Sequence, residues 1–277
     1  MTKHTTMRTL MKFAKKAPVS SKSTINFNIQ PINGEETVLP QPSITPDVSV
    51  IIPAYCEEET IAEVLNRVIK ASWSMGDVEI IVVDDGSTDK TGKVVAGFPF
   101  VKYIRHKTNM GKGAALRTGI KNARGKILVI QDADLEYAPE YIPSIVKPII
   151  DNSVDMVYGS RFNSRPEGMS ISHYIGNSIL SMVAGFLYQV TITDVMTGQK
   201  AFRRGLLEDA ELKENGFAVE IEITTIGLNG SEQTKYGEVP IPYAYRQHGV
   251  SKIGYIDGFK SLIKLFATYF SSEIRLN

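Results

Sequence analysis

Three acidic residues stand within five positions at the end of an apolar run, in the segment VIQDADLEYAPE at residues 129–140. They are Asp132, Asp134 and Glu136. Like charges this close repel one another, and their burial costs several kcal/mol unless a partner compensates it. Because alternate residues of an extended strand point the same way, Asp132 and Asp134 can reach one cation. Oxygen ligands suit Mg²⁺ or Mn²⁺, so the sequence predicts such a site, with Glu136 as a further ligand or a support.

A second pair of acids, Asp84 and Asp85, precedes a glycine turn in DDGSTDKTG at residues 84–92. A buried aspartate there can accept a hydrogen bond from a nucleotide base or a ribose hydroxyl. The same segment also fits a plain strand–turn–helix cap, in which Ser87 or Thr88 caps the following segment. This motif alone leaves both interpretations open.

A glycine-rich segment, NMGKGAALRTG at residues 109–119, has some features of a phosphate-binding loop. It lacks the upstream glycine and the Ser or Thr after the lysine of a Walker A loop, which argues against that motif. A helix start eased by glycine, with Lys112 near an anion, stays open.

The elements that would position these residues alternate along the chain. Short apolar runs predict strands at residues 48–55, 78–87, 101–106, 126–134 and 155–162. Helices are predicted at residues 57–73, 111–125 and 139–152. Repeated β-α-β units imply an α/β fold with a mainly parallel sheet and helices on both faces. Ligands bind outside the carboxyl ends of such strands, which is where the polar motifs begin.

The chain beyond residue 160 is less regular. Residues 202–214 have helical character, and residues 238–246 are a strand candidate. Apolar residues at three- and four-residue steps predict an amphipathic helix near the C-terminus. Residues 171–193 carry no formal charge, but the polar residues among them favour a buried or membrane-touching helix over a membrane span.

The composition limits the function and the partners. With 31 basic and 30 acidic residues among 277, the chain is near neutral, which argues against a nucleic-acid partner. The single cysteine, Cys56, excludes an internal disulfide and suits a reducing compartment.

Residues 1–47 form a basic arm and linker, which fits a solvated tail, a lipid-binding segment or a transit peptide. Residues 256–277 are expected as an amphipathic helix that packs on the domain or contacts a membrane.

Five motifs together resemble family 2 glycosyltransferases with the GT-A fold. They stand in the order and spacing of that family: VSVIIPAYCEEETI, IIVVDDGSTDKT, NMGKGAALRTGI, VIQDADLEYAPE and GSRF. The resemblance runs from about residue 48 to about residue 260. It is strongest to the polyprenyl-phosphate sugar synthases of the family, through TDVMTGQKAFRR, FAVEIEI and EVPIPYAYRQHGVSKIGYIDGFKSL. The resemblance implies a Rossmann-like GT-A domain at residues 48–255.

The resemblance also implies roles for individual residues. The nucleotide would be held by Pro53, Tyr55, Glu57 and Asp85. The metal and the diphosphate of a nucleotide sugar would be bound by Asp132, Ala133, Asp134 and Glu136. The phosphates of donor or acceptor would be neutralised by Arg161, Arg246 and Lys252. The expected catalytic set is Asp134, Arg161, Arg246 and Lys252.

Two departures from the family pattern matter. Cys56 stands where the family commonly has Asn, which puts that contact in doubt. The transmembrane helices of some relatives are missing, so a lipid would be reached through an anchor subunit, the amphipathic tail, residues 171–193 or the basic arm. A Gln-x-x-Arg-Trp element is also missing, since the one Trp is Trp73, which argues against a processive polysaccharide synthase.

The resemblance implies an inverting, metal-dependent, non-processive transfer of a hexose from a nucleotide-diphosphate sugar to a polyprenyl or dolichyl phosphate. The donor would be of the GDP-mannose or UDP-glucose type, and the enzyme would lie peripherally at the cytoplasmic face of a membrane. The alternative is a soluble cytoplasmic enzyme with a soluble or glycan hydroxyl acceptor, which needs a carboxylate base such as Glu220 or Glu222. A third hypothesis is a nucleotide-sugar-binding protein without catalysis, which the intact Asp132 and Asp134 oppose.

Overall fold

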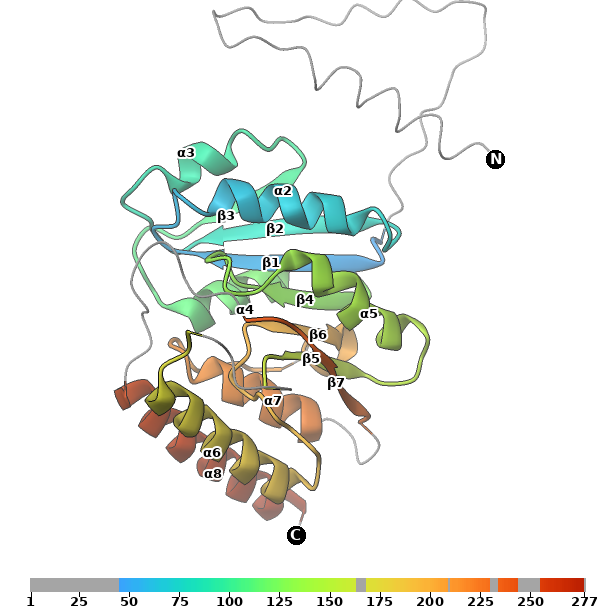
Figure 1. Ribbon diagram of the computed structural model, residues 1–277, viewed down its shortest axis with the longest axis vertical. Helices are drawn as coiled ribbons and strands as arrows, with labels where there is room; N and C mark the ends of the chain where they lie inside the picture. The colour runs from blue at the N-terminus through green and yellow to red at the C-terminus, as the bar shows by residue number, and fades with distance from the viewer. Residues whose placement is uncertain (1–44, 163–167, 209, 230–233, 244–254, 277) are drawn as a thin grey trace, which may run out of the picture. The chain divides into compact units, whose positions relative to one another are not determined.

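The computed structural model describes residues 45–162, 168–208, 210–229, 234–243 and 255–276. Almost all of the predicted basic arm therefore lies outside the described residues. The described chain forms a sheet in the order β3-β2-β1-β4-β6-β5-β7 (Figure 1). Its strands are β1 (Val48–Ala54), β2 (Val78–Asp84), β3 (Val101–Arg105), β4 (Ile127–Gln131), β5 (Met156–Ser160), β6 (Gln199–Arg203) and β7 (Tyr236–Pro240).

The sheet is mainly parallel. Strand β1 pairs in parallel with both β2 and β4, β2 pairs in parallel with β3, and β5 pairs in parallel with β7. Only β6 among the described strands is antiparallel to its neighbours, β4 and β5. This arrangement confirms the predicted α/β class, and the carboxyl ends of β1, β2 and β4 meet at one edge of the sheet.

Helices cover both faces of the sheet (Figure 1). They are α2 (Ile61–Ser72), α3 (Thr91–Val95), α4 (Lys112–Asn122), α5 (Ile142–Ile150), α6 (Ile171–Tyr188), α7 (Val219–Asn229) and α8 (Tyr255–Leu276), with short 3₁₀ turns η1 (Pro139–Tyr141) and η2 (Arg204–Leu206). Because successive strand residues point to opposite faces, Ile52 packs with α2 and α5, whereas Ile51 packs with α4 and α7.

Helices α6 and α8 form an additional layer outside α7, and they run side by side in Figure 1. A third apolar cluster joins them to α7 through Leu180, Ala184, Ile221 and Leu265. Among the described helices none has the length and apolar character needed to cross a bilayer.

Strand β6 corrects the prediction of helical character at residues 202–214. Ala201 and Phe202 are fully buried on opposite faces of the sheet, each in a different core cluster. That alternation is a strand pattern, and a strand inserted between β4 and β5 satisfies backbone groups on both of its edges. The helix-like composition after it yields only the turn η2.

Candidate active site

One cavity of about 1190 Å³ lies at the carboxyl ends of the parallel strands. The predicted residues that line it are Pro53, Tyr55, Glu57, Asp85, Asp132, Ala133, Asp134, Glu136, Arg161 and Glu220. The parallel sheet brings them together because β1, β2, β4 and β5 all end at this edge. Two predicted residues, Arg246 and Lys252, lie outside the described residues.

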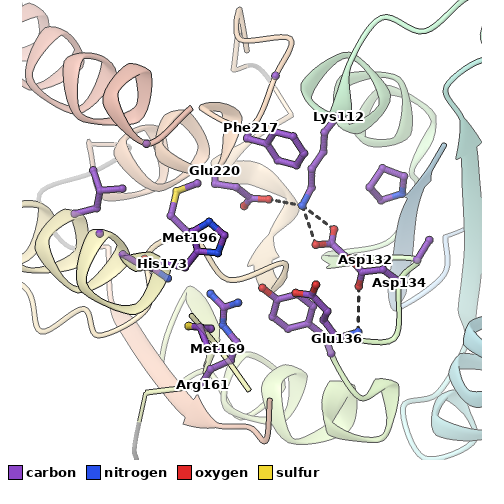
Figure 2. Close-up of a pocket in the computed structure, with 18 of the residues that line it drawn as sticks. Lys112, Asp132, Asp134, Glu136, Arg161, Met169, His173, Met196, Phe217 and Glu220 are labelled. Carbon is purple, nitrogen blue, oxygen red and sulfur yellow. Dashed lines mark hydrogen bonds and ion pairs between the residues drawn. The ribbon is translucent and has the colours of Figure 1, made fainter. Parts of the chain in front are cut away.

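Lys112, at the start of α4, is the partner of Asp132. Its ammonium lies 2.7 Å from Oδ1 and 2.9 Å from Oδ2 of Asp132, and 2.8 Å from Oε1 of Glu220. Figure 2 shows Lys112 reaching between these two carboxylates. From the sequence, a position of Lys112 near an anion was only an open possibility. Its place in the glycine-rich segment 109–119 was the one indication of that role.

The negative charge around Asp132 is only partly compensated. Burial raises the pKa of Asp132 to about 7, against the opposing effect of Lys112, and the nearby carboxylates of Asp134 and Glu220 add to the rise. A cation brought to this point would therefore be bound favourably.

The acidic site fits a divalent cation whose remaining ligands come from a substrate. Its side-chain donors are carboxylate oxygens, the donors that Mg²⁺ and Mn²⁺ prefer. In the described part of the chain no three His, Cys, Asp or Glu side chains are grouped closely enough to hold a metal by themselves. Asp132 and Asp134 would therefore share the cation with diphosphate oxygens, as is usual for Mg²⁺.

Glu136 lines the cavity with Asp132 and Asp134, and its role as a metal ligand stays a prediction. Its backbone N–H donates to Asp134 Oδ1 at 3.1 Å and so helps to orient that carboxylate. Burial opposes the charged form of Arg161, but Asp194 and, more weakly, Glu136 raise its pKa above the ordinary value. Glu136 therefore acts electrostatically on Arg161 as well as on the acidic site.

Gly198 leaves room for the carboxylate of Asp132. A Cβ added at Gly198 would lie 2.0 Å from Asp132 Oδ2, so any side chain there would displace the carboxylate. We expect Gly198→Ala to lower the activity of this site by about 100-fold, because a misplacement near 1 Å has that effect. Activity assays together with thermal melting measure this. Gly205→Ala, whose added Cβ meets nothing closer than 4.0 Å, is the control and should leave the activity unchanged. Equal loss in both variants would contradict the assignment.

The two candidate bases have structural partners. Burial disfavours the charged form of Glu220, but Lys112 and Lys200 outweigh it and hold the pKa of Glu220 below its ordinary value. Glu222 lies outside the cavity, where it accepts hydrogen bonds from the backbone N–H groups of 213 and 214 and from Lys264 at 2.8 Å. The lowered pKa makes Glu220 a weak proton acceptor, and Glu222 does not line the cavity.

Asp85 holds the loop that leads into α4. Its carboxylate accepts from the backbone N–H of Met110 at 2.9 Å and of Gly111 at 2.7 Å. His106 joins it through Nδ1 at 2.7 Å and contacts Thr118 Oγ1 through Nε2 at 2.9 Å. Asp85 was predicted to contact the nucleotide; in the structure it lines the cavity and also positions the start of α4.

We expect His106→Ala to lower the free energy of unfolding by about 1–3 kcal/mol, because it removes a partner from the buried carboxylate of Asp85 and from the half-buried hydroxyl of Thr118. Urea denaturation measures this. Thr118→Val removes only the contact at Nε2 and should cost less. A His106→Ala protein as stable as the wild type would show that the network contributes nothing.

Arg161, which follows β5, is held by Asp194. The two side chains form a bidentate pair, with Nε–Oδ2 at 2.6 Å and Nη2–Oδ1 at 2.8 Å. Asn177 of α6 also donates to Asp194 at 2.8 Å, and the guanidinium lies 5.1 Å from the ring centre of Tyr137. Asp194 was not among the predicted site residues, although it belongs to the TDVMTGQKAFRR motif. This pair presents Arg161 to the cavity beside α6.

A Rossmann-like sheet with strand-end acids and cationic side chains in one cavity is the architecture of GT-A glycosyltransferases. The family model described as Glycosyl transferase family 2 matches residues 49–210, more than half of the chain. The chain belongs to glycosyltransferase family 2 and is an enzyme that transfers a sugar.

Curated relatives cover most of the chain. It is 34% identical over 227 residues to an uncharacterized protein of Methanocaldococcus jannaschii, covering 79% of this chain and 90% of the relative. It is 31% identical to a UDP-N-acetylglucosamine–dolichyl-phosphate N-acetylglucosaminyltransferase of Methanococcus voltae, covering 79% of this chain and 94% of that one. A dolichol-phosphate mannosyltransferase of Pyrococcus furiosus is 33% identical, covering 74% of this chain and 59% of the relative.

Solved structures share the fold. Glucosyl-3-phosphoglycerate synthase of Mycobacterium tuberculosis, in complex with Mn²⁺, uridine diphosphate and phosphoglyceric acid, superposes with a TM-score of 0.66 at 22% identity. The match covers 81% of this chain and 78% of that chain. At this identity the similarity establishes the GT-A fold alone.

Proposed function

We propose that this enzyme transfers a hexose from a nucleotide-diphosphate sugar to a polyprenyl phosphate, with inversion, with the help of Mg²⁺ or Mn²⁺, and without processive elongation. The observation that carries the proposal is the lining of the cavity. It extends from the acids at the strand ends to apolar side chains on α6 and α8, such as Ile179 and Phe259. An acceptor with a phosphate head and an apolar tail has the polarity of this lining.

An exposed apolar surface supports a lipid acceptor. We call it the apolar ridge, formed by Ile171, Ile175, Ile179, Met182 and Phe186 of α6 and by Phe259, Ile263, Phe266 and Phe270 of α8. Phe186 is 82% exposed and Phe259 64% exposed. Exposed apolar helix faces are typical of helices that lie in the interface of a bilayer. Ile179 and Phe259 belong both to the ridge and to the lining of the cavity. The proposed location is therefore peripheral on a membrane, and it needs no anchor subunit.

The named relatives agree with this acceptor class. The Methanococcus voltae relative is named for transfer to dolichyl phosphate, and the Pyrococcus furiosus relative for dolichol phosphate. A dodecaprenyl-phosphate galacturonate synthase of Rhizobium johnstonii is 28% identical. These names differ in the sugar transferred, so donors of both the GDP-mannose and the UDP-glucose type stay candidates for this chain.

The charged side chains of the cavity have separate roles in the proposed reaction. The bond from sugar C1 to the diphosphate oxygen breaks while an oxygen of the acceptor phosphate forms a bond to C1 from the opposite face. Asp132 and Asp134 would hold the divalent ion, which when bound stabilises negative charge on the leaving diphosphate. Lys112 provides a cation beside Asp132, and Arg161 orients the acceptor phosphate next to α6. A phosphate oxygen is already anionic, so no general base is required.

A donor and acceptor screen tests the proposal. Purified protein with Mg²⁺ or Mn²⁺ is given GDP-mannose, UDP-glucose or UDP-N-acetylglucosamine, with polyprenyl phosphate in vesicles or with phosphoglycerate in solution. We expect a sugar-linked lipid phosphate and no product without metal. Transfer to phosphoglycerate alone would favour the soluble-acceptor alternative, and no transfer to lipid phosphate from any donor would exclude the proposal.

Vesicle flotation tests the apolar ridge. We expect Phe186→Ser with Phe270→Ser to weaken flotation about tenfold or more, because each change removes apolar surface from the bilayer. The control is Phe100→Ser, which is 90% exposed and lies between α3 and β3, away from the ridge. If the wild type does not float and instead forms a dimer that the ridge variants disrupt, the ridge is a protein interface.

A further inference from the structure

We propose that Lys112 occupies the cation position at Asp132 until the donor arrives, so that the divalent ion is bound tightly only together with a nucleotide diphosphate. This inference rests on the proposed function, since it assumes a metal and a diphosphate donor. Lys112 would thus make the binding of the divalent ion depend on the binding of the nucleotide diphosphate.

Both carboxylate oxygens of Asp132 contact the ammonium of Lys112. Lys112 Nζ lies 2.7 Å from one and 2.9 Å from the other, and both side chains are largely buried. Breaking a buried ion pair is costly, because it leaves a buried charge without its partner. A divalent ion arriving alone at Asp132 would have to displace Lys112, which would then keep only Glu220, a carboxylate shared with Lys200, as its counter-charge.

A second anchor allows Lys112 to give up Asp132 without leaving the cavity. Glu220 Oε1 lies 2.8 Å from Lys112 Nζ, and Glu220 is itself held by the buried Lys200. A lysine ammonium has three donor hydrogens, so Lys112 can keep Glu220 while another hydrogen turns to a phosphate oxygen. A diphosphate therefore supplies the counter-charge that Lys112 loses at Asp132.

The exchange is confined to the side chain, because the backbone at the start of α4 is fixed. Asp85 holds the Gly111 N–H, and Gly111 has a φ of 98°, a conformation that favours glycine. Gly113 is packed so closely that an added Cβ would lie 2.1 Å from the carbonyl oxygen of Glu214. Lys112 can thus rotate between Asp132 and a phosphate while α4 stays in place.

The coupling between the two ligands is measurable without turnover. Titration of Mn²⁺ followed by electron paramagnetic resonance gives its Kd with and without UDP or GDP. For the full-length wild type we expect binding at least about tenfold tighter with nucleotide, and by linkage an equal effect of Mn²⁺ on the nucleotide. In Lys112→Met, Mn²⁺ alone should bind more tightly than to the wild type, and the effect of nucleotide should fall below about threefold.

Two further variants guard against misfolding. Lys112→Gln removes the positive charge but keeps a hydrogen-bond donor beside Asp132 and Glu220, and we expect the same loss of coupling. Lys126→Met removes a lysine exposed on the surface and should behave as the wild type. Thermal melting confirms folding of each.

The outcomes distinguish the inference from the proposed function. If Mn²⁺ binds with nucleotide but both Lys112 variants keep the wild-type coupling, Lys112 does not control the site, whereas the proposed metal dependence stands. If the wild type binds no Mn²⁺ even with UDP or GDP, the metal dependence fails and the inference fails with it.

Discussion

Replacing Asp134 with Asn should lower sugar transfer by about 10²- to 10³-fold, the usual effect of removing one group that stabilises transition-state charge. Asp134 is 8% exposed and lines the cavity next to Asp132. The amide keeps an oxygen that can accept from the Glu136 N–H, so we expect the loop to keep its shape. The negative charge that would hold a divalent ion is lost. Initial rates with saturating donor and metal measure the change.

The control is Asp151→Asn, which removes an acid from an exposed pair with Lys147 and should leave the rate unchanged. Melting temperatures of both variants should stay close to that of the wild type. If Asp134→Asn retains more than half of the wild-type rate, the acidic site does not stabilise the leaving group.

The second large effect is expected at Asp194. Asp194→Asn breaks a buried bidentate pair and leaves Arg161 without its counter-charge, so we expect the free energy of unfolding to fall by about 3–5 kcal/mol. We also expect a higher KM for the lipid phosphate, because the guanidinium is no longer oriented toward the cavity. Urea denaturation and steady-state kinetics at varied acceptor measure the two effects.

A double variant separates stability from function at this pair. Arg161→Met with Asp194→Leu replaces both charges by apolar side chains, which often restores the stability lost on breaking a buried pair. We therefore expect stability near the wild type but transfer still impaired. Recovered transfer in the double variant would show that Arg161 has no role with the acceptor.

The fold was largely predictable because its core follows simple periodicity. Runs such as residues 48–55 and 78–87 are buried on both faces, as parallel strands between helix layers must be, and they became β1 and β2. Strand β6 escaped prediction because its pairing with β4 lies across nearly seventy residues of chain and no local pattern reports it.

The positions of the acidic residues were predictable, whereas their partners were not. Glu220 and Glu222 are two residues apart on α7, but the first faces Lys112 and the second Lys264. Their spacing on a helix places them on different sides, but it does not say which side faces the cavity. The same holds for Asp194, whose role depends on Arg161, 33 residues earlier in the chain.

The class of fold, the family and the edge of the sheet that carries the site follow from the sequence, because strand ends and motif spacing are local properties. Folding brings Lys112 to Asp132 and Asp194 to Arg161, and it places apolar faces of α6 and α8 beside the cavity. These contacts join residues from separate elements, and a charge or an apolar face acquires its function from the groups that packing brings next to it.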